Sequence, residues 1–290
     1  MKKAETIAAL LQEARKALFD ADIELSALDA RLLLQAAGGL THEQLIAEPN
    51  MVLPAGKISR FKSFIDRRLL HEPVTRILGE REFYGRPFQV SLAVLDPRAD
   101  TETIIELTLQ LLDSEPKRIL DLGTGSGAIA VTLLAERHEW SGIAVDLSAE
   151  ALEIAKANAN ALGVAQRLVF HNAAWFNGIA EKFDLIVSNP PYIPQLEVFE
   201  LFLEVQNFDP HLALDGGDDG LDAYRAIAAG SAEHLNSNGL VILEIGAGQS
   251  GDVTAILKSQ GFELAGQKSD LGGHVRALAF KPRSFVIIQD

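Results

Sequence analysis

The chain has 290 residues, of which 26 are Lys or Arg and 40 are Asp or Glu, so its formal net charge is −14. With 48% hydrophobic and 23% charged residues, the composition excludes a disordered or fibrous chain. The acidity argues against a protein that grips a nucleic-acid backbone, because phosphate is bound mainly by Lys and Arg. Residues 1–75 carry 10 basic and 10 acidic residues, whereas residues 76–290 carry 16 and 30. This asymmetry predicts two modules with different partners.

Several classes of site and location are excluded by what the sequence lacks. There is no Cys, which removes disulfides, thiolate metal sites and thiol nucleophiles and fits a reducing compartment, so we expect a cytoplasmic protein. The His residues show no metal-ligand spacing, so no metal is expected. The apolar run near the N-terminus is broken by polar residues, which favours an amphipathic helix over a signal peptide. No stretch approaches the ~18 apolar residues of a membrane span, so no membrane partner is expected.

Residues 1–73 are predicted to form a helical domain. Apolar residues recur at helical spacing in 3–18, 27–37 and 54–70, and Thr41 with Gln44 forms a capping-box pattern for a short helix between them. The last helix carries a set of basic residues on its polar side, which is interpreted either as a solvated face or as a docking surface for an acidic partner. These residues are Lys57, Arg60, Lys62, Arg67 and Arg68.

Residues 74–95 are predicted to be a β-hairpin linker, because alternating apolar residues are interrupted by Gly79, Gly85 and Pro87. From 96 to 290 strand-like and helix-like segments alternate, which predicts an α/β fold with a doubly wound parallel sheet and ligands at the carboxyl ends of its strands. A short link near 271–273 predicts an antiparallel strand at the edge of the sheet. Strands are expected at 118–121, 142–146, 167–171, 184–188, 240–245, 262–267 and 275–280, and helices at 149–161 and 223–235.

The first predicted strand ends in a glycine-rich loop. Glycines allow the tight turn into a helix and a close approach of the backbone to a ligand. The loop also fits a variant of the dinucleotide fingerprint, so a nicotinamide-dependent oxidoreductase is one reading. Asp121, at the start of the loop, would repel a pyrophosphate and favour a cation. Asp146, which ends the next strand, suits the hydroxyls of a ribose or, equally, caps the following helix. Both acids suit the sulfonium cofactor S-adenosylmethionine. The loop is Asp121-Leu122-Gly123-Thr124-Gly125-Ser126-Gly127.

The strongest local motif is Asn189-Pro190-Pro191-Tyr192, directly after the strand expected at 184–188. The two prolines fix the backbone and leave carbonyl groups unpaired. The Asn189 oxygen and a proline carbonyl can together accept both hydrogens of a planar NH2 group, against which Tyr192 can lie. Such a site would hold an amide or amino nitrogen with its lone pair aimed at an electrophile. The simpler interpretation is a rigid turn.

Together, the loop, Asp146 and the Asn-Pro-Pro-Tyr motif resemble class I S-adenosylmethionine-dependent methyltransferases that act on planar nitrogen. Further motifs between 72 and 280 resemble the release-factor glutamine N5-methyltransferases in particular, and a helical N-terminal module is also typical of that family. The sequence differs from the family pattern at Asp96, Ala99 and Ala174, where an apolar residue, a proline and an acid are usual. The resembling motifs are Glu72-Pro73 with Ile77-x-Gly79 and Glu82-Phe83-x-Gly85, Asp96-Pro97-Arg98 with Thr101-Glu102, 213–217 with 219–221, Glu244-Ile245-Gly246 with Gln249, and Asp270-Leu271 with Gly273 and Arg276.

The resemblance implies a fold, a reaction and roles for matching residues. The fold is a Rossmann-like methyltransferase sheet with a helical bundle and a hairpin linker. The reaction transfers a methyl group from S-adenosylmethionine to the side-chain amide nitrogen of a glutamine in peptide chain release factors, without direct binding of nucleic acid, and a monomer is expected. A DNA or RNA amino-group methyltransferase is the alternative, which the charge of −14 disfavours. The implied cofactor site comprises Asp121, Gly123, Thr124, Gly125, Ser126, Gly127, Asp146, Trp175 and Asn189; Asn189, Pro190 and Tyr192 are implied as catalytic, and these three with Pro191 as substrate-binding.

Overall fold

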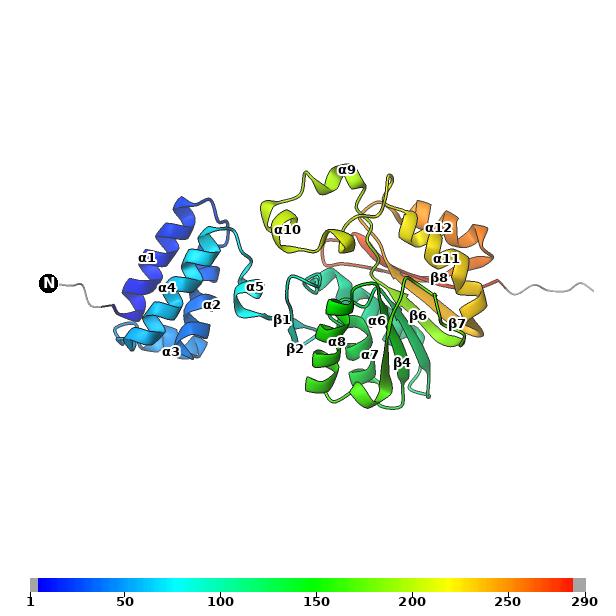
Figure 1. The fold of residues 1–290 in the computed structure, drawn as a ribbon, viewed down its shortest axis with the longest axis horizontal. Helices are drawn as coiled ribbons and strands as arrows, with labels where there is room; N and C mark the ends of the chain where they lie inside the picture. The colour runs from blue at the N-terminus through cyan, green and yellow to red at the C-terminus, as the bar shows by residue number, and fades with distance from the viewer. Residues whose placement is uncertain (1–4, 284–290) are drawn as a thin grey trace, which may run out of the picture. The chain divides into compact units, whose positions relative to one another are not determined.

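The structure is a computed structural model that describes residues 5–283. The chain forms two compact units (Figure 1). One contains the residues up to Glu80 together with Phe202–Phe208, and the other contains Arg81–Leu201 and the residues from Asp209 onward. Within the described part of the chain, no helix has the length and apolarity needed to cross a lipid bilayer.

The first unit is a helical bundle, as predicted. Leu10, Leu33 and Phe61 come from three different helices and are each 2% exposed or less in one continuous core. Thr41 begins the third helix with the predicted capping box, since its hydroxyl accepts from Gln44 N at 3.2 Å and the Gln44 side chain accepts from Thr41 N. The helices are α1 (Ile7–Asp20), α2 (Ser26–Gly38), α3 (His42–Ala47), α4 (Ala55–Leu69), α5 (Val74–Leu78) and, after a long excursion of the chain, α10 (Leu203–Phe208).

The basic residues of α4 do not form a free cationic surface. Arg68 is 5% exposed and pairs with Asp29 at 2.7 Å and with Glu204 of α10 at 2.6 Å. The other basic residues also have partners. Lys57 donates to the Gly38 carbonyl, Lys62 and Arg67 form ion pairs with Glu5 and Glu72, and the Arg60 guanidinium lies over the Phe64 ring. Burying a guanidinium requires such partners, so Arg68 belongs to the core and joins α10 to the bundle. The docking-surface interpretation therefore loses its main support.

The predicted hairpin is present but shorter than expected. Residues Val74–Leu78 form helix α5 instead, because Pro73 provides an N-terminal start and Gly79, at φ +75°, ends the helix in the left-handed conformation. The hairpin itself consists of β1 (Glu80–Phe83) and β2 (Arg86–Gln89). Phe83 and Phe88 from its two strands pack edge to face with 5.9 Å between ring centroids, within the core of the second unit.

The second unit is built on a seven-stranded sheet, and all seven predicted strands are present. The order is β5-β4-β3-β6-β7-β9-β8, with parallel pairing from β5 to β7. The expected antiparallel hairpin, β8 with β9, lies at the edge of the sheet; β9 pairs with both β7 and β8, so the outermost strand is β8. The strands are β3 (Arg118–Leu122), β4 (Ser141–Asp146), β5 (Leu168–Asn172), β6 (Phe183–Ser188), β7 (Leu235–Glu244), β8 (Phe262–Ser269) and β9 (Val275–Pro282).

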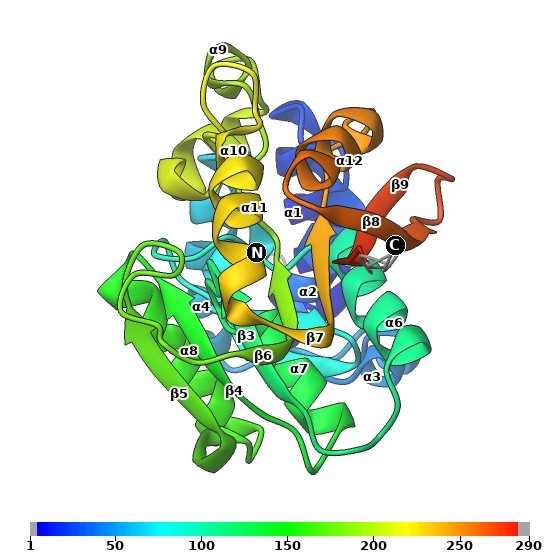
Figure 2. The same cartoon turned by 90° about the vertical axis from the view of Figure 1, so that its right-hand side faces the viewer.

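Helices cover both faces of this sheet (Figure 2). Alternate residues of a strand point to opposite faces: Ile119 packs with α6 and α7, and Leu120 packs with α11 and α12. The predicted doubly wound α/β fold is thus confirmed. The helices of the second unit are α6 (Glu102–Leu111), α7 (Ala128–Glu136), α8 (Ala149–Ala161), α9 (Gln195–Val198), α11 (Asp222–His234) and α12 (Ser250–Ser259), with 3-10 turns η1 (Ala99–Thr101), η2 (Ala165–Arg167) and η3 (His211–Ala213).

Candidate active site

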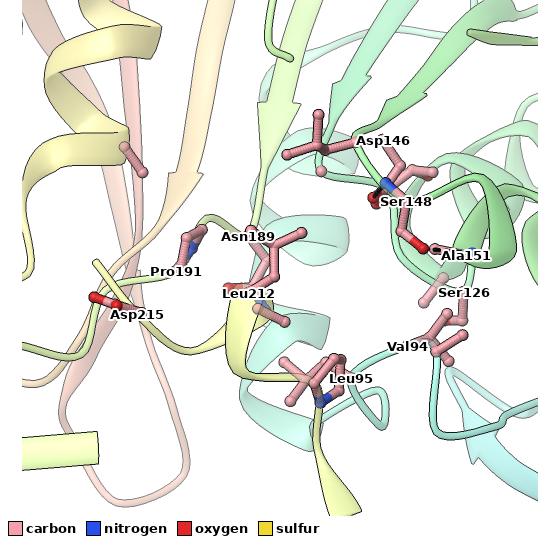
Figure 3. A pocket seen from close by; sticks show the side chains of 18 of the residues that line it. Val94, Leu95, Ser126, Asp146, Ser148, Ala151, Asn189, Pro191, Leu212 and Asp215 are labelled. Carbon is pink, nitrogen blue, oxygen red and sulfur yellow. Dashed lines mark hydrogen bonds between the residues drawn. The ribbon is translucent and has the colours of Figure 1, made fainter. Parts of the chain in front are cut away.

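A cavity of about 1010 Å³ lies in the second unit where the parallel strands β3, β4 and β6 end. The loop that follows each strand contributes to its wall, and segments at 92–98 and 210–217 complete it. Figure 3 shows Asn189 between Pro191 on one side and Asp146 with Ser148 on the other. The carboxyl ends of parallel strands are where α/β folds bind ligands. The predicted site residues that line the cavity are Gly123, Thr124, Ser126, Asp146, Trp175, Asn189 and Pro191.

The backbone of the glycine-rich loop turns its N–H groups toward the protein. The N–H groups of Gly123 and Thr124 both donate to the Val145 carbonyl at 2.9 Å, and that of Gly127 donates to Thr124 O at 2.8 Å. The Gly125 N–H donates to the Asp146 carboxylate at 2.8 Å. A pyrophosphate site needs free backbone N–H groups, and these four are already used. The loop therefore opposes the nicotinamide dinucleotide interpretation.

Asp146 joins the two segments that border the cavity. Its Oδ2 holds the Gly125 N–H, and its Oδ1 accepts from Ser148 N at 2.9 Å. The cap of α8 is Ser148, whose hydroxyl accepts from Ala151 N, so Asp146 is not the helix cap of the simpler interpretation. Each carboxylate oxygen retains a lone pair, so Asp146 can still accept a bond from a hydroxyl in the cavity.

Asp121 lies beneath the loop and does not line the cavity. It is 0% exposed, and its Oδ2 accepts from the Thr124 hydroxyl at 2.6 Å and from Ala130 N at 3.2 Å. Burial raises the pKa of its carboxyl to about 7, and the nearby Asp146 carboxylate adds to the effect. Because the Asp121 side chain points into the core, it cannot also face the cavity. Asp121 therefore stabilises the loop from the side opposite the ligand. Gly125 and Gly127 also shape the loop without lining the cavity.

Trp175 borders the cavity in an unusual backbone conformation. Its φ is +50°, in the left-handed region that a bulky residue rarely adopts. Ala173 and Ala174 precede it in the wall, and the indole also packs against the core beneath α11. Such strain persists only where surrounding packing enforces it, and it is commonly found at binding sites. With Ala174 in place of an acid, this part of the wall is apolar.

The Asn-Pro-Pro-Tyr motif divides between the cavity and the structure behind it. Asn189 and Pro191 line the cavity, whereas the Pro190 ring is buried and Tyr192 lies outside the lining. The Tyr192 carbonyl accepts from Gln249 Nε2 at 3.0 Å. Burial raises the pKa of the Tyr192 phenol to about 12, so it stays protonated. The motif is therefore held from behind by the segment after β7.

Two polar residues behind Asn189 had no role in the sequence analysis beyond their place in the resembling motifs. Thr101 lines the cavity at 3% exposure, and its hydroxyl oxygen accepts from Asn189 Nδ2 at 3.1 Å. Glu244 is 1% exposed, and burial raises the pKa of its carboxyl to about 7. The signal that could have found Glu244 is an acid at the carboxyl end of the strand next to β6.

The charge of the lining is mainly negative. Asp96 belongs to it at 7% exposure, and Arg98 is paired with Asp209 at 2.6 Å. Such a wall suits a cationic ligand better than a polyanion. Among residues 5–283, no group of three or more potential metal-ligating side chains is present. The carboxylates in the lining are those of Asp96, Asp146, Glu150, Asp215 and Asp222.

Comparison with solved structures identifies the fold. The structure is similar to a ribosomal protein L11 methylase from Lactobacillus delbrueckii subsp. bulgaricus, with a TM-score of 0.50 and 22% identity over 66% of this chain and 83% of that chain. It is also similar to the hMettl16 catalytic domain, with a TM-score of 0.57 and 17% identity over 78% of this chain and 84% of that chain. These likenesses confirm the predicted class I methyltransferase fold.

Comparison of sequences identifies the family. Residues 9–79 match the PrmC N-terminal domain, and residues 98–206 match the methyltransferase small domain. A release factor glutamine methyltransferase of Bradyrhizobium diazoefficiens is 46% identical over 90% of both chains, and one of Cereibacter sphaeroides is 45% identical over 93% of this chain and 96% of its own length. The predicted family, enzyme class and cofactor, S-adenosylmethionine, are confirmed. The chain belongs to the release factor glutamine methyltransferase family.

Proposed function

We propose that this chain transfers a methyl group from S-adenosylmethionine to the side-chain amide nitrogen of a glutamine in a peptide chain release factor, and that the reaction takes place in the cavity beside Asn189. The observation that carries the proposal is the position of Asn189. It lies in the wall of a cavity whose charged residues are mainly acidic, across from Asp146 and the glycine-rich loop. The methyl donor and an amide can therefore meet at one point in the second unit.

The residues around the glycine-rich loop fit the methyl donor. Asp146 has acceptor capacity left for ribose hydroxyls, and the apolar wall of Ala173, Ala174 and Trp175 suits an aromatic base. The acidic lining suits the positive charge of the sulfonium and ammonium groups. When bound, S-adenosylmethionine would supply an electrophilic methyl group: the bond from sulfur to methyl is exchanged for one from nitrogen to methyl, the sulfonium leaves as a neutral thioether, and the nitrogen releases one proton to solvent.

Asn189 and the backbone of Pro190 are proposed to hold the acceptor amide. The Asn189 side-chain oxygen and the Pro190 carbonyl would each accept one hydrogen of the glutamine NH2 group, which fixes the plane of the amide. An amide nitrogen is a poor nucleophile, so orientation and exclusion of water are the main contributions of the site. Tyr192 completes the proposed pocket from behind and, with its raised pKa, does not act as a base near neutral pH.

Recognition of the release factor is proposed to involve the helical domain of residues 1–73. This part of the chain balances its charges, in contrast to the acidic remainder. The two relatives described above are release factor glutamine methyltransferases, and the match covers 90% or more of each of them. This similarity supports a protein substrate over a nucleic acid. The mainly negative lining of the cavity supports the same choice.

The test is methyl transfer to a purified release factor. The protein is incubated with the factor and isotope-labelled S-adenosylmethionine, and the peptides are analysed by mass spectrometry. We expect one added methyl group on one glutamine-containing peptide, lost in Asn189→Ala. Asn160→Ala is the matched control, because Asn160 is exposed on α8 and bonds only the Lys156 carbonyl among the contacts found for its side chain. Methylation of nucleic-acid amino groups with no labelling of the factor would contradict the proposal.

A further inference from the structure

A chain of buried polar side chains lies directly behind Asn189. Asn189 Nδ2 donates to Thr101 Oγ1 at 3.1 Å, and hydrogen bonding from both side chains lowers the pKa of the Glu244 carboxyl, which is 1% exposed. Glu244 ends β7, and Thr101 ends η1, so the contact joins three segments that are far apart in the sequence. Oε2 of this buried carboxyl has no hydrogen-bond partner among the described residues.

The chemistry of this chain gives it a direction. A carboxylate only accepts hydrogen bonds, so the Thr101 hydroxyl donates its hydrogen to Glu244 and offers its lone pairs to Asn189. The groups behind Asn189 are therefore hydrogen-bond acceptors, and they hold its NH2 group toward Thr101 and Glu244. The two ends of a carboxamide have nearly the same shape, so without such partners the group can turn over. The Oδ1 end is then left for the cavity.

We propose that Glu244 and Thr101 are positioning residues that orient the Asn189 amide with Oδ1 toward the acceptor, and that this orientation makes the site select an amide over a carboxylate. The inference rests on the proposed function, in which Asn189 holds the glutamine NH2 group. Oδ1 accepts from an NH2 group but repels a carboxylate, which offers only lone pairs. A reversed Asn189 would present its own NH2 group and favour glutamate.

The state of Glu244 depends on the groups packed around it. The pKa of its carboxyl is raised to about 7, chiefly by burial and in part by Asp100, whereas hydrogen bonding from Thr101 and Asn189 and the charge of Arg276 act in the opposite direction. Tyr224, which donates to the Glu244 backbone carbonyl, and Tyr192 lie close by and stay neutral because burial raises both phenol pKa values. As the pH falls through about 7, Glu244 gains a proton and becomes a weaker hydrogen-bond acceptor. Its hold on Thr101 and Asn189 then weakens, so turnover should fall on the acid side.

The test compares two substitutions of Thr101 with a matched control. Thr101→Val keeps the shape but removes the hydroxyl, and Thr101→Ser restores it. Thr108→Val is the control, because Thr108 is 0% exposed on the adjoining helix α6 and its hydroxyl has no partner among the described residues. We expect kcat/KM for the release factor to fall about tenfold in Thr101→Val. Affinity for S-adenosylmethionine should stay the same in all three variants, and Thr101→Ser and Thr108→Val should behave like the original protein.

Selectivity is the second readout, which a general loss of stability would not change. A release factor with its target glutamine replaced by glutamate is used as a competitive inhibitor. It should bind the original protein much more weakly than the glutamine form, and Thr101→Val should reduce this preference at least about tenfold. Glu244→Gln should remove the acid limb near pH 7 from the pH profile of kcat. An unchanged preference in Thr101→Val, or an unchanged acid limb in Glu244→Gln, would overturn the inference.

A third readout does not require any substrate. The side-chain NH2 hydrogens of Asn189, assigned by their absence in Asn189→Ala, should exchange slowly with solvent because they bond buried acceptors. Exchange should become faster in Thr101→Val and stay slow in Thr108→Val. If this pattern is found but the original protein does not methylate the release factor, the proposed function fails and the orientation of Asn189 stands. If the protein methylates the factor and exchange is the same in both variants, the inference fails and the function stands.

Discussion

The Asp146 carboxylate accepts a hydrogen bond from the Gly125 backbone N–H at 2.8 Å, which joins the end of β4 to the loop after β3. The second oxygen of the same carboxylate holds the start of α8 through Ser148 N at 2.9 Å. One side chain thus fixes two borders of the cavity. A site held in this way is organised before its ligand binds, which reduces the entropy cost of binding.

Replacing Asp146 by Asn should weaken binding of S-adenosylmethionine about 10- to 100-fold, because one carboxylate oxygen becomes an NH2 group that faces another donor. The loop loses its bond to Asp146, and the cavity loses a negative charge. Isothermal titration calorimetry with S-adenosylmethionine measures the effect.

Asp184→Asn is the control for that substitution. Asp184 also accepts a backbone N–H, from Arg118 at 2.8 Å, and it accepts from Asn236 Nδ2 at 2.8 Å, but it lies at the opposite end of β6 from Asn189. Its replacement should change stability and leave the dissociation constant unaltered. Equal affinities in Asp146→Asn and Asp184→Asn would show that Asp146 does not contribute to the binding site.

Asp121 should make the free energy of unfolding depend on pH. The pKa of its carboxyl is about 7 in the folded chain against an ordinary 3.8. Between these values the folded chain retains a proton that the unfolded chain has released, so the free energy of unfolding decreases as the pH rises. Asp121→Asn lacks this contribution. As the pH rises from about 5 to 8, the free energy of unfolding of the variant should therefore increase by about 1–3 kcal/mol relative to that of the original protein.

Urea unfolding at several pH values measures this difference. Glu244 has the same trend because its pKa is also raised, but it is present in both proteins and cancels in the comparison. A constant difference between variant and original protein across this range would contradict the raised pKa of Asp121.

Most of the fold could be predicted because strong local patterns and tertiary packing agree. The strand at 118–121 and the helix at 149–161 are found within one residue of their predicted ends, since each has a clear apolar pattern and a glycine or polar cap. The sequence predicts Val74–Leu78 as part of the hairpin because the alternating apolar residues of the following stretch are extended back over it. Val74 and Ile77 are in fact three residues apart, which fits a helix, and Pro73 and Gly79 bound that helix.

The site could be predicted only where residues follow strand ends directly. Gly123, Asp146 and Asn189 do so, and they line one cavity. Asp121 was expected to face the ligand, but its place inside β3 puts the carboxylate under the loop. Thr101 influences the pKa of Glu244 although the two residues are 143 positions apart (244 − 101), and no local pattern reveals such a pairing.

Replacing Arg68 by Ala should destabilise the helical unit by about 3–5 kcal/mol, because Asp29 would stay buried without its counter-charge. Asp29 is 6% exposed, and its bond to Arg68 Nε is 2.7 Å long. Glu204→Gln should have a much smaller effect, since the Glu204 side chain is 39% exposed and water can replace part of the interaction. Urea unfolding followed by circular dichroism measures both variants, and similar losses in the two would contradict a buried pair between Arg68 and Asp29.

Gly220 tests whether the support behind Tyr192 matters for the reaction. A Cβ atom at Gly220 would lie 2.4 Å from the Tyr192 carbonyl oxygen, which also accepts from Gln249 Nε2 at 3.0 Å. Gly220→Ala should displace this carbonyl and with it the segment that begins at Asn189. A misplacement of about 1 Å can reduce turnover by roughly 100-fold. We expect kcat/KM for the release factor to fall about 10- to 100-fold while the affinity for S-adenosylmethionine is unchanged.

Gly261→Ala separates this displacement from backbone strain. Gly220 and Gly261 have φ values of +74° and +86°, so alanine costs about 1 kcal/mol in conformational energy at either position. At Gly261, however, nothing lies within 4 Å of the added Cβ. The two variants should therefore lose similar stability from strain, and only Gly220→Ala should lose turnover beyond that. Equal kinetics in both would mean that the position of the Tyr192 carbonyl does not influence methyl transfer.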